Sequence, residues 1–141
     1  MGGSEVTEKI RIGIVGYGNL GRGVELAVAK NPDMELVAVF TRRPVEQVNT
    51  GEQGTLVLNV SKAHEYTDQI DVMILCGGSA TDLPQQGPEF AAMFTTVDSF
   101  DTHSRIPEYF ALMDKTAKAK GKLAAISIGW DPGLFSLQRL M

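Results

Sequence analysis

The sequence has too little of several residue types to support an exported, membrane-spanning or zinc-binding protein. Cys76 is the single cysteine, so no internal disulfide can form, and no second soft ligand stands near it to complete a zinc site. No apolar run approaches the ~18 residues of a membrane span, and residues 1–9 lack the apolar stretch of a signal peptide. We therefore expect a cytoplasmic protein that contacts no membrane, with residues 1–9 forming a flexible leader.

Basic residues are scarce relative to acidic ones. The chain has 13 lysines and arginines against 17 aspartates and glutamates, which gives no support for a broad nucleic-acid-binding surface. Its 141 residues are 43% apolar, enough to bury one core, and no repeat or low-complexity segment interrupts them. We therefore expect residues 10–141 to form one domain that binds no nucleic acid.

Apolar runs alternate with segments of helical periodicity along the chain. The apolar runs predict strands at residues 10–16, 35–40, 55–60, 70–76, 95–98 and 123–128, of which 55–60 is the weakest. Helical spacing predicts helices over 20–28, 84–94 and 106–120, the last ending near Gly121 as a C-cap. Strands that are mostly apolar throughout and alternate with helices imply a parallel sheet covered on both faces. The predicted fold is α/β, a Rossmann-type doubly wound parallel sheet of about six strands.

A G-x-G-x-x-G motif follows the first predicted strand, and its six residues are Gly16, Tyr17, Gly18, Asn19, Leu20 and Gly21. It follows a buried strand, opens a helix and lies in a βαβ unit of about thirty residues, a context that favours a dinucleotide site over an empty glycine-rich turn. Gly16 suits the tight turn, Gly18 lets the backbone approach a diphosphate, and Gly21 lets the helix pack closely on the strand. Backbone N–H groups at the start of the helix would then face the anion.

The residues after the second predicted strand indicate which dinucleotide is bound. Enzymes that select NAD place an acidic residue there, about twenty positions beyond the motif, to hold the ribose hydroxyls. This chain has Thr41, Arg42 and Arg43 instead, and arginine presents planar, forked donors that match phosphate oxygens. Two arginines in a loop can also be merely solvated, but their position after this strand favours NADP as the cofactor.

Six blocks of the sequence together resemble the meso-diaminopimelate dehydrogenases, and they run nearly from end to end. They are IVGYGNLGR at 14–22, NPDM at 31–34, FTRR at 40–43, LCGGSATD at 75–82, TVDSFD at 96–101 and GWDPG at 129–133. The last three blocks are far more specific than the glycine motif, which many unrelated nucleotide-binding domains share. The chain departs from the family in length, because the family continues with a substrate and dimerisation domain and a final segment that returns to the first domain.

The resemblance implies reversible, NADP-dependent oxidative deamination of meso-2,6-diaminopimelate at its D-configured centre, giving L-2-amino-6-oxopimelate and ammonia. It also implies a step of lysine and cell-wall precursor metabolism, a small amino acid as the partner, and a homodimer for the full-length protein. A substrate domain is expected beyond Met141. Residues 1–141 alone should then bind the cofactor with little or no deamination, because the groups that orient the substrate would be missing.

Asp101, Asp131 and Trp130 are the catalytic candidates, and the family's motifs place these roles on them. The two carboxylates each follow a predicted strand, at the edge where ligands of open α/β folds bind, and they could hold the substrate ammonium and accept protons. Trp130 would wall the reacting carbon. Each candidate also has a structural alternative, because the aspartates could cap the helices that follow them and the tryptophan could belong to the core.

Further cofactor contacts are expected from the segment that follows the strand at 70–76, through Cys76, Gly77, Gly78, Ser79 and Thr81. Its glycines would let the chain pass close to a ribose. Pro132 and Gly133 would border the nicotinamide. The Cys76 thiol itself is interpreted as structural.

Three polar residues outside these segments receive no catalytic role. His64 is interpreted as structural, and Asp98 is left unassigned. The loop position of His103 fits a solvated or helix-capping histidine at least as well as a general base.

Two other functions stay open at this point. One is a different dehydrogenase on the same fold, such as a sugar oxidoreductase or dihydrodipicolinate reductase, since fold does not fix reaction. The block at 129–133 argues against it. The other is a binding module that holds NADP without turnover, which the length of the chain keeps open. No metal is expected in any of these readings.

Overall fold

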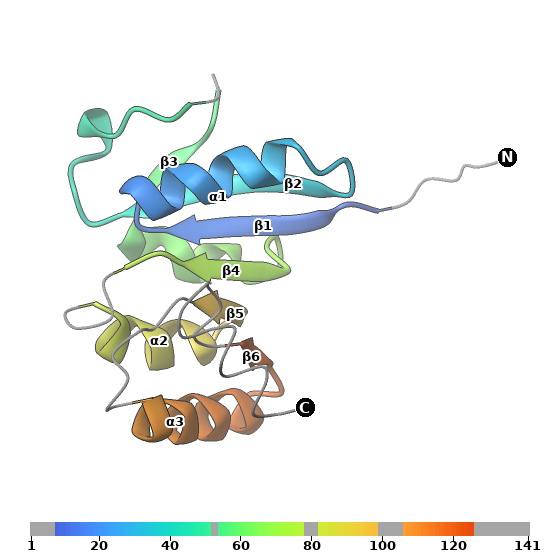
Figure 1. Ribbon diagram of the computed structural model, residues 1–141, viewed down its shortest axis with the longest axis vertical. Helices are drawn as coiled ribbons and strands as arrows, with labels where there is room; N and C mark the ends of the chain where they lie inside the picture. Colours follow the sequence, from blue (N-terminus) through green and yellow to red (C-terminus); the bar gives the residue numbers. More distant parts are fainter. Residues whose placement is uncertain (1–7, 52–53, 78–81, 99–105, 126–141) are drawn as a thin grey trace, which may run out of the picture. The chain divides into compact units, whose positions relative to one another are not determined.

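The computed structural model describes residues 8–51, 54–77, 82–98 and 106–125, which fall into two compact units divided between Asp71 and Val72. Figure 1 shows strands and helices alternating along the chain in each unit. Within the described ranges, no helix is long and apolar enough to cross a membrane. The units are described in turn.

The first unit contains three parallel strands in the order β3-β2-β1. β1 spans Ile10–Val15, β2 spans Met34–Thr41 and β3 spans Val57–Asn59. The last residues of β1 and β2 are buried, with Val15 and Phe40 fully hidden from solvent. The strands predicted at 10–16 and 35–40 are therefore confirmed, and the weak strand predicted at 55–60 is confined to the three residues of β3.

The described residues of this unit also form one α-helix and two 3₁₀ helices. α1 spans Asn19–Ala29 and packs on β1 and β2, while η1 spans Val45–Gln47 and η2 spans Val60–Tyr66. η2 packs on β2 and β3, and the ring of Tyr66 meets Phe40 edge to face at 5.7 Å between centroids. Neither 3₁₀ helix was predicted, because such short helices carry no apolar periodicity to distinguish them from loops.

The described part of the second unit also contains three parallel strands, in the order β4-β5-β6. β4 spans Val72–Leu75, β5 spans Thr95–Asp98 and β6 spans Ala124–Ala125. Among the described residues of the whole chain the strands number six, as predicted. The strand predicted over 123–128 begins near the observed position, and its residues 126–128 lie outside the described ranges.

Two helices of the second unit pack against each other. α2 spans Leu83–Ala91 and α3 spans Ile106–Ala119, so the predicted helix over 84–94 is present but ends earlier. Gly121 has φ +68°, and the Lys122 N–H donates to the Ala117 carbonyl at 2.8 Å. Glycine adopts this left-handed conformation without a steric penalty, which confirms Gly121 as the C-cap predicted for α3.

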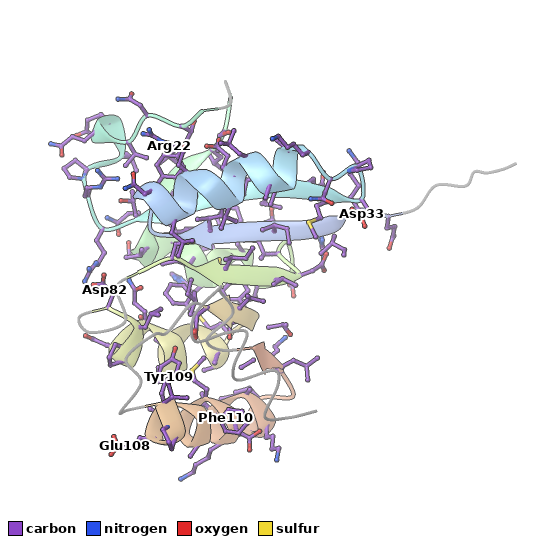
Figure 2. All side chains as sticks on the ribbon, in the orientation of Figure 1. Arg22, Asp33, Asp82, Glu108, Tyr109 and Phe110 are labelled. Carbon is purple, nitrogen blue, oxygen red and sulfur yellow. The ribbon has the colours of Figure 1, made fainter. Side chains whose placement is uncertain are left out.

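A buried hydrogen bond joins α3 to the end of β5 in the second unit. The Tyr109 hydroxyl, on the first turns of α3 (Figure 2), donates to Asp98 Oδ2 at 2.6 Å, and Asp98 is only 2% exposed. A Cβ at Gly87 of α2 would overlap the Tyr109 hydroxyl. The absence of a side chain at Gly87 therefore lets α2 approach the tyrosine. Burial and the Asp98 carboxylate raise the pKa of Tyr109 well above its usual value.

We expect Tyr109→Phe to lower the free energy of unfolding by about 1–3 kcal/mol, because Asp98 stays buried and loses a donor. The folded-state pKa of Tyr109 is raised. The contribution of Tyr109 to the free energy of unfolding is therefore complete below about pH 10, the pKa of tyrosine in the unfolded chain. That contribution is lost as the pH rises above this value. Urea denaturation between pH 7 and 11 tests this, and the free energy of unfolding of the variant should fall less steeply at alkaline pH.

Tyr66→Phe, at a part-buried ring, is the control and should lower the free energy of unfolding by less than about 0.5 kcal/mol. Equal stability of Tyr109→Phe and wild type at pH 7 would contradict the assignment.

Candidate cofactor-binding site

The glycine motif lies between β1 and α1, as the sequence predicts. Gly16 has φ +92°, and its N–H donates to the Phe40 carbonyl of β2 at 2.8 Å, so the turn is tied to the sheet. A Cβ at Gly21 would overlap the Gly16 carbonyl oxygen. The tight turn and the close approach of helix to strand that the motif predicts are therefore both present.

The beginning of α1 leaves room for an anion. Gly18 is the N-cap residue of α1, so the N-cap position has no side chain that could cap the helix. A Cβ at Gly18 would meet no atom within 4 Å, so the space beside its backbone is open. Backbone N–H groups with the positive end of the helix dipole suit a phosphate. The residues present therefore fit a dinucleotide diphosphate, and the roles of Asn19 and Leu20 in holding it stay predictions.

The structure brings Arg43 to the glycine motif. Its Nη2 donates to the Tyr17 carbonyl at 2.7 Å, and its backbone N–H donates to Thr41 Oγ1 at 3.0 Å. Thr41 is buried at the end of β2, whereas Arg42 and Arg43 are exposed. Thr41 thus shapes the turn that presents the arginines, which is a role the sequence did not indicate. Both guanidiniums lie in the segment where a third phosphate is expected.

A buried carboxylate near the motif was missed by the sequence analysis. Glu25 of α1 is 1% exposed and accepts hydrogen bonds from the Tyr17 hydroxyl and from the Gly51 N–H, the latter at 3.0 Å. Its position could have been found, because Gly21, Glu25 and Val28 recur at the spacing of one buried helix face. Glutamate is rarely buried without partners, so a charge at such a position is a signal of a specific contact.

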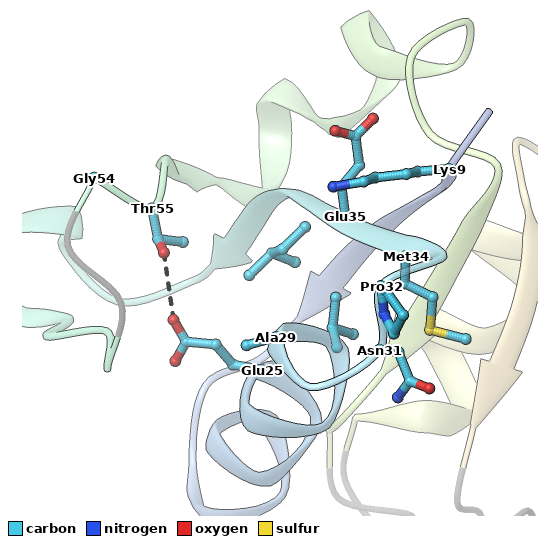
Figure 3. Close-up of a pocket in the computed structure, with 11 residues that line it drawn as sticks. Lys9, Glu25, Ala29, Asn31, Pro32, Met34, Glu35, Gly54 and Thr55 are labelled. Atoms are coloured by element: carbon cyan, nitrogen blue, oxygen red, sulfur yellow. Dashed lines mark hydrogen bonds between the residues drawn. The ribbon is translucent and has the colours of Figure 1, made fainter. Parts of the chain in front are cut away.

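A groove in the first unit is lined by the second half of α1 and the start of β2, and Figure 3 shows Lys9 and Glu35 on one side of it and Glu25 with Thr55 on the other. None of the residues that line it belongs to the glycine motif. This groove is therefore separate from the proposed diphosphate site.

In the second unit, Gly77 follows β4 and faces the first turn of α2. A Cβ at Gly77 would lie 2.7 Å from the Asp82 Cβ and 2.9 Å from Gln86 Oε1. Packing against α2 therefore already requires glycine here, in addition to any approach of a ribose. The Gln86 Oε1 atom is buried, and none of the described residues donates a hydrogen bond to it. The sequence did not single out Gln86 either.

Cys76 lies beside Gly77, and its thiol is part-buried. Burial raises the pKa of this thiol to about 12. We therefore expect iodoacetamide to alkylate Cys76 at pH 8 roughly 10³-fold more slowly than a small free thiol, because the thiolate is the reactive species. Mass spectrometry of the native protein measures this rate, and the same protein in urea serves as the control. A native rate similar to the urea rate would contradict the burial.

The other predicted site residues lie outside the described ranges. They are Gly78, Ser79, Thr81, Asp101, Trp130, Asp131, Pro132 and Gly133, together with His103. Asp98, which was left unassigned, and His64, which was interpreted as structural, lie within the described ranges. Asp98 Oδ2 accepts a hydrogen bond from the Tyr109 hydroxyl, and His64 Nδ1 lies 2.9 Å from the Ser61 carbonyl oxygen in η2. Among the described residues, no cluster of histidine, cysteine and carboxylate side chains could hold a metal ion.

Comparison with known proteins bears directly on the resemblance found in the sequence. A meso-diaminopimelate D-dehydrogenase of Ureibacillus thermosphaericus is 66% identical over 133 residues, which cover 94% of this chain and 40% of that protein. The chain is homologous to the meso-diaminopimelate D-dehydrogenases. It spans about two fifths of the length of the curated relatives it matches. No model of a protein family matches the chain.

Solved structures give the same result for the fold. The diaminopimelate dehydrogenase of Corynebacterium glutamicum, in complex with diaminopimelate, is 47% identical with a TM-score of 0.84, and the match covers 96% of this chain and 40% of that one. An engineered D-amino acid dehydrogenase bound to NADP⁺ is 48% identical with a TM-score of 0.83, covering 94% and 40%. The Rossmann-type α/β fold predicted from the sequence is thereby confirmed.

Proposed function

We propose that this chain supplies the NADP-binding part of an enzyme that oxidatively deaminates meso-2,6-diaminopimelate at its D-configured centre. The products would be L-2-amino-6-oxopimelate and ammonia. The observation that carries the proposal is the combination of the open glycine turn before α1 with Arg43 held beside it. The relatives named above act as meso-diaminopimelate D-dehydrogenases or bind diaminopimelate or NADP⁺, which supports the same reaction.

The proposal assigns the cofactor's parts to separate groups of this chain. The diphosphate would be held by backbone N–H groups at the start of α1, and the extra phosphate of NADP by Arg42 and Arg43. Bound NADP supplies the hydride acceptor. The ribose and nicotinamide of the cofactor would be bordered by two further segments, with Cys76, Gly77, Gly78, Ser79 and Thr81 in the first and Pro132 and Gly133 in the second.

The catalytic residues in this proposal are Asp101, Asp131 and Trp130. The two carboxylates would orient the substrate ammonium and accept the proton that it loses, since a carboxylate near an amine performs both tasks. Trp130 would wall the reacting carbon, and water would then add to the imine left by hydride loss and release ammonia. The full-length protein is proposed to act as a homodimer on this small amino-acid substrate, in the cytoplasm and in lysine metabolism.

Cofactor selection is the first test of the proposal. Calorimetric titration of the chain with NADP and with NAD should give distinctly tighter binding of NADP. Equal affinity for the two dinucleotides, or binding of neither, would refute the cofactor assignment.

Turnover is the second test. NADPH formation by the full-length native protein should depend on meso-diaminopimelate and exceed the rates with D-lysine and without substrate. A rate that does not respond to meso-diaminopimelate would refute the substrate. NADP binding by a full-length protein without any turnover would favour a binding module instead.

A further inference from the structure

Glu25 lies at the centre of the hydrogen bonds that join the glycine motif to the loop after β2. Its Oε1 atom accepts a hydrogen bond from the Tyr17 hydroxyl and a second one, 3.0 Å long, from the Gly51 N–H. Its Oε2 atom accepts a hydrogen bond from Thr55 Oγ1 at 3.3 Å. Figure 3 shows the last of these bonds, which reaches from α1 to the segment before β3. One side chain of α1 therefore holds two points of the loop that follows the arginines.

The burial of Glu25 needs an explanation beyond packing. The side chain is 1% exposed, and a buried charge is costly unless several donors compensate it. An apolar residue on this face of α1 would pack against the sheet without that cost. The described donors to the carboxylate, on Tyr17, Gly51 and Thr55, belong to the motif and to the loop after β2. The contact is therefore suited to joining these two segments rather than to stabilising the helix itself.

Tyr17 connects Glu25 to Arg43. Its hydroxyl binds Glu25 and accepts from the Gly51 N–H at 3.1 Å, while its carbonyl accepts from Arg43 Nη2 at 2.7 Å. The ring is 6% exposed, and the Arg22 guanidinium lies over it at 5.9 Å from the centroid. Because both ends of Tyr17 are held, the position of its carbonyl, and with it the guanidinium of Arg43, depends on the hydroxyl end.

We propose that Glu25 is a specificity-determining positioning residue. It acts through Tyr17 to fix the positions of Arg43 and the loop after β2 relative to the diphosphate-binding turn. This increases the ratio of the affinities for NADP and NAD. This inference rests on the proposed NADP-binding function. Glu25 touches no part of the cofactor in this scheme. Its contribution is to fix the distance between two phosphate-recognising segments, and preorganised recognition groups bind more tightly than mobile ones.

The test compares Glu25→Met with Glu25→Gln. Methionine fills a similar volume but accepts none of the three hydrogen bonds, whereas glutamine keeps an acceptor for Gly51 and Tyr17 and can donate to the Thr55 hydroxyl. We expect Glu25→Met to reduce the ratio Kd(NAD)/Kd(NADP) by about tenfold, mainly through weaker NADP binding, and Glu25→Gln to retain most of it. Calorimetry with both dinucleotides measures the ratio.

Two further variants separate positioning from general stability. Val28→Ala removes packing from the same buried face of α1, and it should lower the melting temperature while leaving the ratio unchanged. Tyr17→Phe removes only the hydroxyl of the link, keeps the ring, and should reduce the ratio in the same direction as Glu25→Met. It also serves if Glu25→Met fails to fold.

The outcomes distinguish this inference from the function on which it rests. If wild type selects NADP and both Glu25→Met and Tyr17→Phe keep its ratio, the positioning role is wrong and the proposed function stands. A loss of affinity that is equal for NAD and NADP also overturns the role, because a merely structural defect acts on both. If wild type does not select NADP, the proposed function itself fails.

Discussion

Replacing Gly21 with alanine is expected to abolish tight dinucleotide binding and to lower the free energy of unfolding by about 3 kcal/mol. The added Cβ would overlap the carbonyl oxygen of Gly16, which is backbone and cannot rotate away. Alanine favours helix over glycine by roughly 1 kcal/mol, so the two effects oppose each other. The steric effect wins, because relief requires α1 to move away from the turn that receives the diphosphate.

Gly23→Ala is the matched control for this prediction. Gly23 lies in the same helix, is exposed, and has no atom within 4 Å of the place where a Cβ would stand. We expect this variant to be more stable than wild type by up to about 1 kcal/mol and to bind NADP normally. Urea denaturation and an NADP titration on both variants measure the difference. Wild-type stability and affinity in Gly21→Ala would show that helix and turn are not as closely packed as described.

Replacing both Arg42 and Arg43 with alanine should weaken NADP binding by ~10² to 10³. Charge-assisted hydrogen bonds contribute roughly 1.5 to 3 kcal/mol each, and exposure of both side chains to solvent holds the total near that of one or two such bonds. NAD lacks the phosphate that these side chains would bind, so its affinity should fall by only a few-fold. Titration calorimetry with the two dinucleotides gives both values.

The single variants should not behave alike. Arg42→Ala should affect NADP alone, whereas Arg43→Ala also releases the Tyr17 carbonyl and should weaken NAD to a smaller degree. Lys30→Ala, at the opposite end of α1, removes an exposed positive charge far from the motif and serves as the charge control. A double variant that binds NADP as tightly as wild type would remove the basis for assigning this cofactor.

The sequence predicted those parts of the fold in which residue type follows burial directly. Val15 and Phe40 end apolar runs, and such runs leave few options other than buried strands. The left-handed glycines at positions 16 and 121 were likewise predictable, because a turn and a helix C-cap both demand that conformation. η2 was not predictable, since its burial rests on Ala63 and on the contact of one tyrosine ring with Phe40.

The candidate site was predicted less completely. The motif and the arginines were found because their chemistry is local in sequence, whereas the partners of Glu25 are up to 30 residues away from it. Gly77 was interpreted only as an approach for ribose, because the crowding by Asp82 and Gln86 depends on how α2 lies against β4. The catalytic assignments of Asp101, Trp130 and Asp131 stay predictions.

The contact between Gly87 and Tyr109 has a consequence for sequence variation among relatives. The two positions are 22 residues apart, yet the tyrosine hydroxyl occupies the volume that any side chain at position 87 would need. Relatives that carry alanine or serine at position 87 should therefore carry a smaller residue than tyrosine at position 109. A side chain at position 87 would therefore be tolerated only after a smaller residue had replaced the tyrosine at position 109.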